Sequence, residues 1–267
     1  MINLIKDIIS NRKMIIELAF SDFKKRFVGS YFGVVWMFVQ PLATVLVYTL
    51  IFQIGFRATP PIPNIPYVVW LIAGIVPWFY FQETLIQNTN CLYEYNFLVK
   101  KVVFNISLLP IIKLVSTTLS HLCFIIILFI ALIIAKVDFS FQWFLIFYYS
   151  FMLSLLILGL SYITSSINVF FKDMAQIVNI LLQFGIWMCP IMYDESLFSN
   201  KSELISKLLM LNPMYYIING YRNALIGQKF NHNFIYLTIY YLVITLIILI
   251  FGYKLFNKLK EQFADVL

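Results

Sequence analysis

The sequence predicts an all-α membrane protein with six transmembrane helices. Of its 267 residues, 62% are hydrophobic and only 12% are charged, whereas soluble domains average about 25% charged residues. A soluble globule of this size could not cover so many apolar side chains, because its surface still needs polar groups. Long apolar runs such as residues 125–134 are typical of helices that cross a bilayer. The composition therefore excludes a soluble enzyme and a disordered chain.

Six segments are mostly apolar and close to the length of about 20 residues that a spanning helix needs. A helix also satisfies its own backbone hydrogen bonds, which lipid cannot do. The third and fourth segments are longer than one bilayer requires, so we expect them to tilt or to project into the cytoplasm. The predicted spans are residues 34–56, 67–84, 108–135, 141–171, 174–192 and 234–256.

Lys and Arg predict the orientation, because cytoplasmic loops carry an excess of these residues. Thirteen of the 19 lie in the N-terminal segment, in or beside the loops at 91–107 and 172–173, or in the C-terminal tail. Both termini are therefore predicted to face the cytoplasm. The net charge of +7 is explained by that side of the membrane, and no basic stripe indicates a nucleic-acid partner.

Residues 1–28 are predicted to form a cytoplasmic amphipathic helix that lies in the membrane interface. Its apolar positions recur at spacings of four, three and four residues, while charged side chains occupy other faces, with the cations near anionic headgroups. A second interpretation, a basic flank that orients the first span, is compatible with the first. The apolar positions are Ile16, Phe20, Phe23 and Phe27, and the charged ones are Glu17, Asp22, Lys24 and Lys25.

The residues that catalysis or ion coupling would require are few. The two histidines, His121 and His232, are far apart, and no pair of acids lies within one span. No glycine is followed by lysine, as a phosphate-binding loop requires. We therefore expect no catalytic residue, no metal site and no nucleotide hydrolysis on this chain. An ion-coupled secondary transporter stays an alternative, although its ionisable candidates, Glu83 and Lys113, lie near helix ends.

Two predicted spans carry polar residues at helical spacing. Such groups gain nothing from lipid, so these faces should point into the bundle or into a hydrated path. Two interpretations remain open: hydrogen bonds between helices, and the lining of a transport pathway. Amide and aromatic side chains would suit a sugar polymer as cargo. The stripes are Lys113, Thr117 and His121 in the third span, and Gln176, Asn179 and Gln183 in the fifth.

Residues 194–233 form the last extracellular segment, which is too apolar for a free loop. Asn212 before Pro213 is typical of a helix that stops and restarts. The sequence therefore predicts two short helices here that dip back toward the membrane.

Residues 93–105 form a cytoplasmic loop that is also unusually apolar. An exposed apolar patch with a charged rim is typical of a docking helix for a protein partner, and burial against lipid is the alternative. Glu94, Lys100 and Lys101 form the rim, and the patch comprises Phe97, Leu98, Val99, Val102, Val103 and Phe104.

Five short motifs follow one another along nearly the whole chain. In order, they are RFVGSYFGVVW at 26–36 with QPL at 40–42, AGIVPWFYF at 73–81, VFFKD at 169–173, PIMY at 190–193, and LNP at 211–213 followed by YR at 221–222. In this order they resemble the permease subunits of ABC-2 type exporters of cell-envelope polysaccharides. Lys172 stands where the family commonly has arginine, which keeps the charge but loses the bidentate fork.

The resemblance implies one ABC-2 type transmembrane domain over residues 1–267, in a homodimer that sits above two copies of a separate ATPase subunit. That subunit would bind ATP and magnesium, so no cofactor is expected on this chain. The implied segments are the interface helix at 1–28, spans one to five within 29–192, a coupling helix at 93–105, a re-entrant outer segment at 193–233, span six at 234–256 and a cytoplasmic tail at 257–267.

The resemblance also implies roles for particular residues. Those implied to couple to the ATPase are Glu94, Tyr95, Phe97, Leu98, Lys100, Lys101, Lys172 and Asp173. Those implied to form an interfacial gate, with contacts to a lipid diphosphate, are Phe20, Phe23, Lys24, Lys25, Arg26 and Phe27; plain topogenic charge is the alternative for the three cations. Those implied to lie near the extracellular exit are Tyr193, Asn212, Pro213, Tyr221 and Arg222.

The implied cargo is a polymer on a polyprenyl diphosphate lipid, moved across the bacterial cytoplasmic membrane. Residues 54–57 and 261–267 are similar to those of wall teichoic acid exporters, while O-antigen exporters share most of the remaining pattern and a capsule-type polymer is a third candidate. An exporter of a drug or small lipid is the competing interpretation within the superfamily.

Overall fold

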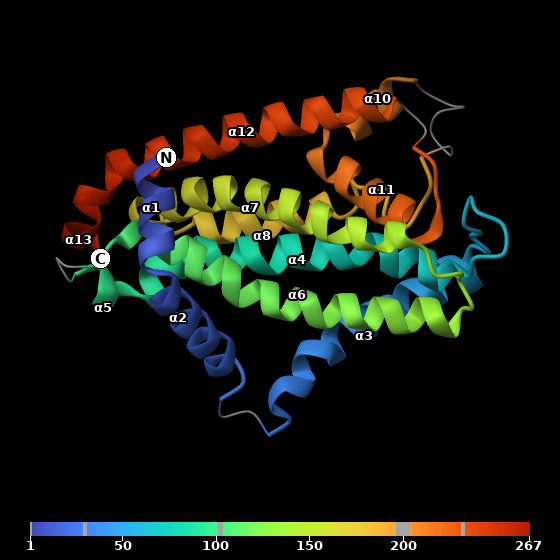
Figure 1. Cartoon of the computed structure of the whole chain (residues 1–267), viewed down its shortest axis with the longest axis horizontal. Coiled ribbons are helices and arrows are strands. Elements are labelled where there is room, and N and C mark those ends of the chain that lie inside the picture. Colours follow the sequence, from blue (N-terminus) through green and yellow to red (C-terminus); the bar gives the residue numbers. More distant parts are fainter. Residues whose placement is uncertain (1, 29–30, 101–103, 196–202, 231–232) are drawn as a thin grey trace.

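The computed structural model describes residues 2–28, 31–100, 104–195, 203–230 and 233–267. Within these ranges the chain forms helices and connecting turns and no strand, which confirms the predicted all-α class. Figure 1 shows an elongated bundle whose long helices run in roughly the same direction. Both chain termini lie at one end of the bundle, called here the terminal end, and the opposite end is called the far end.

Five helical segments are long and apolar enough to cross a membrane, so the chain is a multi-pass membrane protein. Each overlaps one of the predicted spans, although the second and the last extend about ten residues beyond the predicted ends at 84 and 256. They are Gly33–Gly55, Tyr67–Glu94, Ile106–Ile134, Phe141–Phe170 and Phe234–Val266. Their main helices are α3 (Trp36–Thr49), α4 (Tyr67–Glu94), α6 (Leu109–Ile134), α7 (Leu145–Phe170) and α12 (Phe234–Leu259).

The fifth predicted span is shorter than expected. Its helix, α8, covers Met174–Gly185 and has 12 residues, about 18 Å at 1.5 Å per residue, whereas the bilayer core is about 30 Å thick. Residues 186–191 continue as turns, although the sequence stays apolar there. Pro190 has no backbone N–H to donate to a helix, which explains why helical structure does not resume through this stretch.

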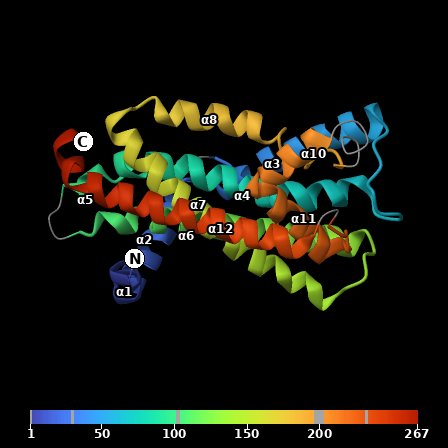
Figure 2. The same ribbon diagram turned by 90° about the horizontal axis from the view of Figure 1, so that it is seen from above.

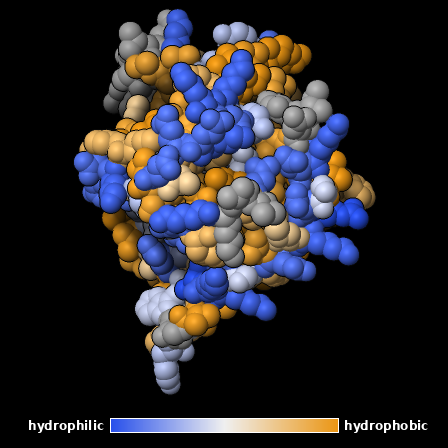
Figure 3. Space-filling view, turned by 90° about the vertical axis from the view of Figure 1, so that its left-hand side faces the viewer, coloured by the Kyte–Doolittle hydropathy of each residue, from blue (hydrophilic) through white to orange (hydrophobic). Residues whose placement is uncertain are grey.

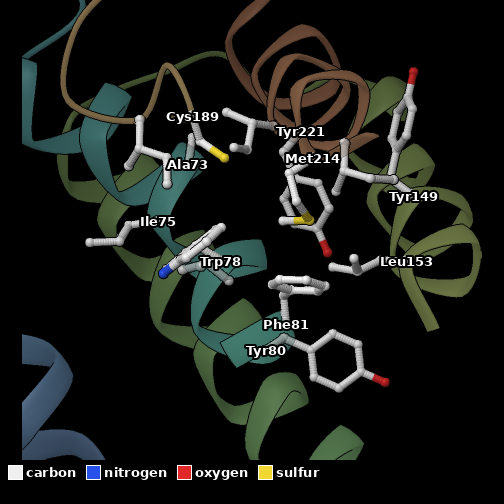
Figure 4. Packing of buried hydrophobic residues seen from close by; sticks show 14 of the residues in the cluster. Ala73, Ile75, Trp78, Tyr80, Phe81, Tyr149, Leu153, Cys189, Met214 and Tyr221 are labelled. Atoms are coloured by element: carbon white, nitrogen blue, oxygen red, sulfur yellow. The ribbon is translucent and has the colours of Figure 1, made fainter. Parts of the chain in front are cut away.

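The helix α4 forms the centre of the bundle. In its most apolar stretch 72% of the residues are buried, because it packs against α6, α7, α8 and α11 (Pro213–Ile226). Figure 4 shows how Trp78 and Phe81 of α4 interleave with Leu153 of α7 and with Met214 and Tyr221 of α11. Aromatic side chains with this much area dominate the packing energy of such a core.

A close backbone contact joins α7 to α12, which overlap in the view of Figure 2. A Cβ atom added to Gly252 would overlap the carbonyl oxygen of Gly159, and one added to Gly159 would lie 2.8 Å from the backbone nitrogen of Leu249. Small residues allow the two backbones to pack this closely. In lipid the hydrophobic effect does not drive helices together, so van der Waals contacts of this kind stabilise their association. The two glycines therefore fix where α12 crosses α7.

The predicted N-terminal helix is present as two helices, α1 (Ile2–Ser10) and α2 (Arg12–Lys25). The α2 helix packs against α6 and buries Ile15, Ala19 and Asp22, while Ile16 and Phe20 are about half exposed and point away from the bundle. The sequence assigns Asp22, with the other charged residues, to faces other than the apolar one, which is the expected buried side of this helix. That assignment is wrong, because Asp22 has partners in the bundle that its local spacing does not reveal.

The docking segment predicted at 93–105 has little helix of its own. The α4 helix continues to Glu94 and is followed by α5 (Asn96–Val99). Phe97 is 55% exposed, but Val99 is only 3% exposed, so Val99 does not belong to the predicted exposed patch. Lys101, Val102 and Val103 lie outside the described residues.

The last helical turn returns to the same end of the molecule. This turn, α13 (Phe263–Val266), lies beside α5 (Figure 1). Phe263 is fully buried, and the Asn96 side chain donates a hydrogen bond to the carbonyl of Leu267 at 3.2 Å. The segments α5 and α13 therefore form one surface at the terminal end.

The far end contains the two short helices that the Asn212–Pro213 pair predicts. They are α10 (Glu203–Leu211) and α11 (Pro213–Ile226). The Asn212 side chain accepts a hydrogen bond from the backbone nitrogen of Met214 and caps α11, with Pro213 at its first position. Because α11 packs between α4 and α7, it lies within the bundle rather than on a free loop.

Candidate functional site

A cavity of about 860 Å³ lies between the Gly33–Gly55 helix, α4 and α8. It exists because the Gly33–Gly55 helix stands apart from the bundle: none of the residues in its most apolar stretch is buried. Aromatic rings and amides line much of it. These residues are Trp36, Tyr48, Trp78 and Trp187, with Gln40, Gln82, Gln87 and Gln183.

The lining of this cavity combines flat apolar faces with neutral hydrogen-bonding groups. Trp78 is 2% exposed and forms part of the packed wall, whereas Trp36 and Trp187 are about half exposed. Rings of this kind present an apolar face, and amide side chains both donate and accept hydrogen bonds. The cavity is therefore suited to a ligand with apolar faces and hydroxyl groups.

A buried carboxylate, Asp22 of α2, joins α2 to α6 and to Tyr95, the residue between α4 and α5, at the terminal end. Its Oδ1 accepts from Lys113 Nζ at 2.6 Å and from the Tyr95 hydroxyl at 2.9 Å. Its Oδ2 accepts from the Ser116 hydroxyl at 2.8 Å and from Arg26 Nη2 at 3.3 Å. Asp22 is only 6% exposed, so these four donors replace the water that the carboxylate loses.

The cluster extends from Asp22 in two directions. On one side Lys113 Nζ also contacts Glu94 Oε2 at 2.5 Å, and the Glu94 side chain is 50% exposed. On the other side Arg26 Nη1 contacts Glu83 Oε1 at 2.6 Å, and both of these residues line the cavity. We call Asp22, Arg26, Glu83, Glu94 and Lys113 the ion cluster; its three carboxylates and two cations leave one net negative charge.

The protonation of the ion cluster follows from its contacts. Burial raises the pKa of Asp22, but the ion pair with Lys113 and the hydrogen bonds from Lys113, Ser116 and Tyr95 outweigh it and hold that pKa below its ordinary value of 3.8. Burial and the negative charge of Asp22 raise the pKa of Tyr95. At neutral pH a Tyr95 phenol therefore donates to an Asp22 carboxylate.

Sequence reasoning missed Asp22, Glu83 and Ser116 as parts of one site. The available signal was the spacing of Asp22 and Arg26, which are four residues apart and form an ion pair of 3.3 Å. The partners come from segments 57 to 94 residues away along the chain. Local periodicity carries no information about such contacts.

The polar stripe of α6 is buried between helices. Lys113, Thr117 and His121 are each at most 3% exposed, and none of the three lines the cavity. Thr117 accepts from the Thr84 hydroxyl of α4 at 2.8 Å. His121 Nε2 lies 2.9 Å from the Tyr221 hydroxyl, and the ring stacks on Tyr80 with centroids 4.3 Å apart.

The polar stripe of α8 lies on the surface. Gln176 and Gln183 are exposed, and Asn179 is partly buried. Of these three amides, Gln183 lines the cavity. The structure therefore separates two stripes that the sequence presents alike.

The three N-terminal cations also differ in their surroundings. Lys24 and Lys25 are exposed at the end of α2, whereas Arg26 is bound to Asp22, Glu83 and Ser116. Of the aromatic residues implied to form a gate, Phe20 is half exposed, Phe27 lines the cavity, and Phe23 contacts Phe27 edge to face at 5.3 Å.

The residues implied to couple to an ATPase lie at the terminal end, but not all are accessible. Tyr95 is 5% exposed and Leu98 is partly buried, while Glu94, Phe97 and Lys100 are exposed. Lys172 and Asp173, in the turn between α7 and α8, are also exposed. Figure 3 shows hydrophilic side chains gathered over this end, with apolar ones between them.

Two of the residues implied to lie at the exit are buried inside the far half of the bundle. Arg222 is 1% exposed and stacks on the Trp70 ring, with its Cζ 3.5 Å from the ring centroid. It donates to the carbonyls of Pro190 and Ile191, each at 2.6 Å, and so fixes the turn after α8. Tyr221 is fully buried, and its hydroxyl is hydrogen bonded to His121 Nε2 and to the Ser150 hydroxyl.

The other three exit residues hold the far end in place. The Asn212 side chain caps α11 and also donates to the sulfur of Cys189 at 3.2 Å. Pro213 begins α11. The Tyr193 hydroxyl donates to the carbonyl of Trp187 at 2.9 Å, which holds Trp187 beside the cavity.

Comparison with known proteins places this architecture in a family. The pattern of the ABC-2 type transporter family matches residues 15–226, from the first turn of α2 to the end of α11. The chain belongs to the ABC-2 type transporter family. This ABC-2 chain is therefore a component of a transporter, and the matched region contains the cavity, the ion cluster and both polar stripes.

Two relatives of this ABC-2 chain extend the comparison to nearly its full length. It is 28% identical over 267 residues to the O-antigen export system permease protein RfbA of Klebsiella pneumoniae, covering 95% of each chain. It is 29% identical over 227 residues to the O-antigen export system permease protein RfbA of Myxococcus xanthus, covering 83% of this chain and 84% of the relative.

In the part of the ABC-2 chain that the structure describes, no group of three or more His, Cys, Asp or Glu residues could hold a metal ion.

Proposed function

We propose that this chain is the permease subunit of an ATP-driven exporter, which moves a polyprenyl-diphosphate-linked cell-envelope polysaccharide across the cytoplasmic membrane. The O-antigen export permeases that resemble it over almost the whole chain support this class of cargo. The observation that carries the proposal is the cavity of about 860 Å³ with its tryptophan and glutamine lining. Sugar rings offer apolar faces to tryptophan and hydroxyl groups to amides.

A homodimer fits the position of this cavity. The Gly33–Gly55 helix and α8 flank the cavity, and both leave large apolar side chains exposed, such as Leu46, Ile54 and Phe184. Part of that surface would contact lipid, and part would face a second copy. Two half-open cavities would then face one another and form a single path for the polymer.

The terminal end is the side on which we propose that the ATPase subunits dock. The excess of Lys and Arg at this end favours its placement in the cytoplasm. Phe97 with Glu94 and Lys100 offers an apolar contact with a charged rim, and Lys172 and Asp173 lie exposed at the same end. Energy would reach the permease through these segments, since the chain has no phosphate-binding loop.

The surroundings of the N-terminal cations refine the proposal for the lipid diphosphate. Exposed Lys24 and Lys25 are free to meet an anionic headgroup at the membrane surface. Arg26 is held by two carboxylates, and the ion cluster has a net negative charge, which disfavours a diphosphate there. We therefore assign the first contact with the diphosphate to the two lysines and not to Arg26.

The test is export in proteoliposomes that contain the permease with its ATPase subunit and a lipid-linked polymer. Trp187→Ala removes an exposed ring from the cavity lining, and Met188→Ala is a matched control on the next residue, which is also exposed but does not line the cavity. We expect Trp187→Ala to reduce export by about tenfold, because the loss of an aromatic ring that stacks on a sugar costs about 1.4 kcal/mol. Met188→Ala should leave export unchanged. Equal effects of the two variants, or transport of a small lipophile in place of the polymer, would contradict the proposal.

A further inference from the structure

The ion cluster connects the proposed docking segment to the wall of the cavity. Glu94 and Tyr95 immediately precede α5, on the side where an ATPase would bind. Arg26 and Glu83 line the cavity. Asp22 is hydrogen bonded to Tyr95 at 2.9 Å on one side and to Arg26 at 3.3 Å on the other. A single buried carboxylate therefore contacts both regions.

This carboxylate makes the polar contacts that hold α2 against α6. The residues that α2 buries are Ile15, Ala19 and Asp22, and the first two belong to an apolar cluster that includes residues of α4 and α6. Of the four hydrogen bonds to Asp22, three come from outside α2, from Lys113 and Ser116 of α6 and from Tyr95, while Arg26 follows directly after α2. The donors Lys113, Tyr95 and Ser116 lie 2.6 to 2.9 Å from the Asp22 oxygens, and a displacement that lengthens one of these distances to about 3.6 Å breaks that hydrogen bond.

A buried ion cluster is not needed to hold a helix in place. Well-packed apolar residues would stabilise such an interface as well or better, because charges lose hydration when they are buried. A cluster differs from apolar packing in being directional, so that it has few acceptable geometries. These properties suit a joint between moving parts better than a static anchor.

We propose that Asp22 is a positioning residue for transport, which transmits movement of the docking segment at Tyr95 to the α2 helix and so to Arg26 at the cavity. This inference rests on the proposed function, because it needs an ATPase subunit that moves the docking segment. Glu94 is the half-exposed member of the cluster, so a partner reaches it first. Lys113 contacts both Glu94 and Asp22. If a partner draws Glu94 away from Lys113, the ion pair between Lys113 and Asp22 changes, and α2, which carries Asp22, moves with it.

The experiment compares two variants of the joint with two matched controls in the full permease–ATPase complex. Tyr95→Phe removes one hydroxyl and keeps the ring, and Asp22→Asn keeps the shape but removes the charge. Tyr241→Phe removes the hydroxyl of a buried tyrosine that bonds to the carbonyl of Met152 at 2.9 Å, outside the cluster, the cavity lining and the docking segment, and Glu17→Gln removes a charge on the exposed face of α2. A spin label at Ser21→Cys, an exposed position beside Asp22, reports movement of α2 when nucleotide is added.

We expect Tyr95→Phe and Asp22→Asn to bind the ATPase subunit and to hydrolyse ATP, while the nucleotide-dependent change in the label is lost. Polymer exported per ATP should fall about tenfold, the size expected when a hydrogen bond to a charged group is lost. Both controls should behave as the parent does. A residue that served the fold alone would change the yield or the unfolding temperature and leave export per ATP unchanged, and that result would overturn the inference.

Failure of the inference is distinguishable from failure of the proposed function. If the parent exports polymer with ATP, and Tyr95→Phe does so with the same yield per ATP and the same label response, the inference is wrong and the proposed function stands. If the parent complex shows no ATP-dependent export, the proposed function fails and the inference fails with it. Asp22→Asn could loosen α2, so Tyr95→Phe, which leaves all the charges in place, decides the outcome.

Discussion

The two polar stripes of the bundle have the same helical spacing and opposite surroundings. On α6, Lys113 and His121 are buried and bonded to other helices. On α8, Gln176 and Gln183 are exposed, and within the described residues no hydrogen bond joins them to another element. The inward stripe stabilises the single chain, whereas the outward stripe is available to a cargo or to a second copy. Polar groups in a membrane helix therefore have a structural or a transport role according to which side of the helix the bundle covers.

The largest expected effect comes from Lys113 on the inward stripe. Lys113→Met removes the cation that contacts Asp22 and Glu94 and leaves the Asp22 carboxylate buried without it. Breaking a buried ion pair from one side costs about 3 kcal/mol or more. The unfolding free energy in detergent micelles should fall by that amount, while exposed Lys25→Met should leave it nearly unchanged. A Lys113→Met protein as stable as the parent would contradict the assignment of this stripe to stability.

The second effect depends on pH and on Asp22. Because the folded-state pKa of Asp22 is below its ordinary value of 3.8, the carboxylate stabilises the fold above that value, and its contribution is lost as the pH falls through the lowered pKa. The difference in unfolding temperature between the parent and Asp22→Asn should stay constant from pH 8 to about pH 4 and shrink below it. A difference that shrinks between pH 7 and pH 5 would show that Asp22 is not the well-bonded carboxylate described above.

A third comparison sets one residue of each stripe against the other. His121→Ala loses the contact with Tyr221 and the stacking on Tyr80, and we expect it to reduce the unfolding free energy by about 1–2 kcal/mol. Gln176→Ala on α8 should change it by less than about 0.5 kcal/mol, as is usual for a surface position. Equal losses in thermal or denaturant unfolding would erase the distinction between the stripes.

The smallest expected changes test the transport role of the outward stripe. Gln183→Leu removes an amide from the cavity lining and should reduce export about fivefold, the effect of one lost hydrogen bond of about 1 kcal/mol. Thr117→Val breaks the hydrogen bond to Thr84 and should cost about 0.6 kcal/mol of stability without changing export per folded molecule. Export measured in proteoliposomes, normalised to folded protein, checks both. The comparison fails if Thr117→Val lowers normalised export and Gln183→Leu does not.

Much of the fold follows from local sequence. Composition and apolar runs predict the all-α class and the five long helices, since about 20 apolar residues cross a bilayer wherever they occur. Asn212 and Pro213 predict the start of α11, because both act through their own backbone. The short α8 follows only in part. Pro190 marks an interruption of the helix, but residues 186–189 before it stay apolar, and Arg222, from a distant helix, binds the carbonyls of Pro190 and Ile191.

The candidate site is less predictable than the fold, because it also depends on contacts between residues that are distant in the chain. Spacing identifies Lys113 and Gln183 as members of stripes but does not say which helix covers which stripe. Asp22 looks like a solvent-facing charge until α6 and Tyr95 are placed beside it. The residues that local sequence describes well are those whose partners are near in the chain, and those of the ion cluster are not.

The most direct test of the account is reconstitution of the purified chain by itself and then with its ATPase subunit. With lipid-linked polymer in the vesicle membrane, we expect the chain alone to hydrolyse no ATP and to move no polymer, with or without a proton or sodium gradient. Addition of the ATPase subunit should make translocation depend on ATP. Translocation by the chain alone, or translocation driven by an ion gradient without the ATPase, would contradict the account.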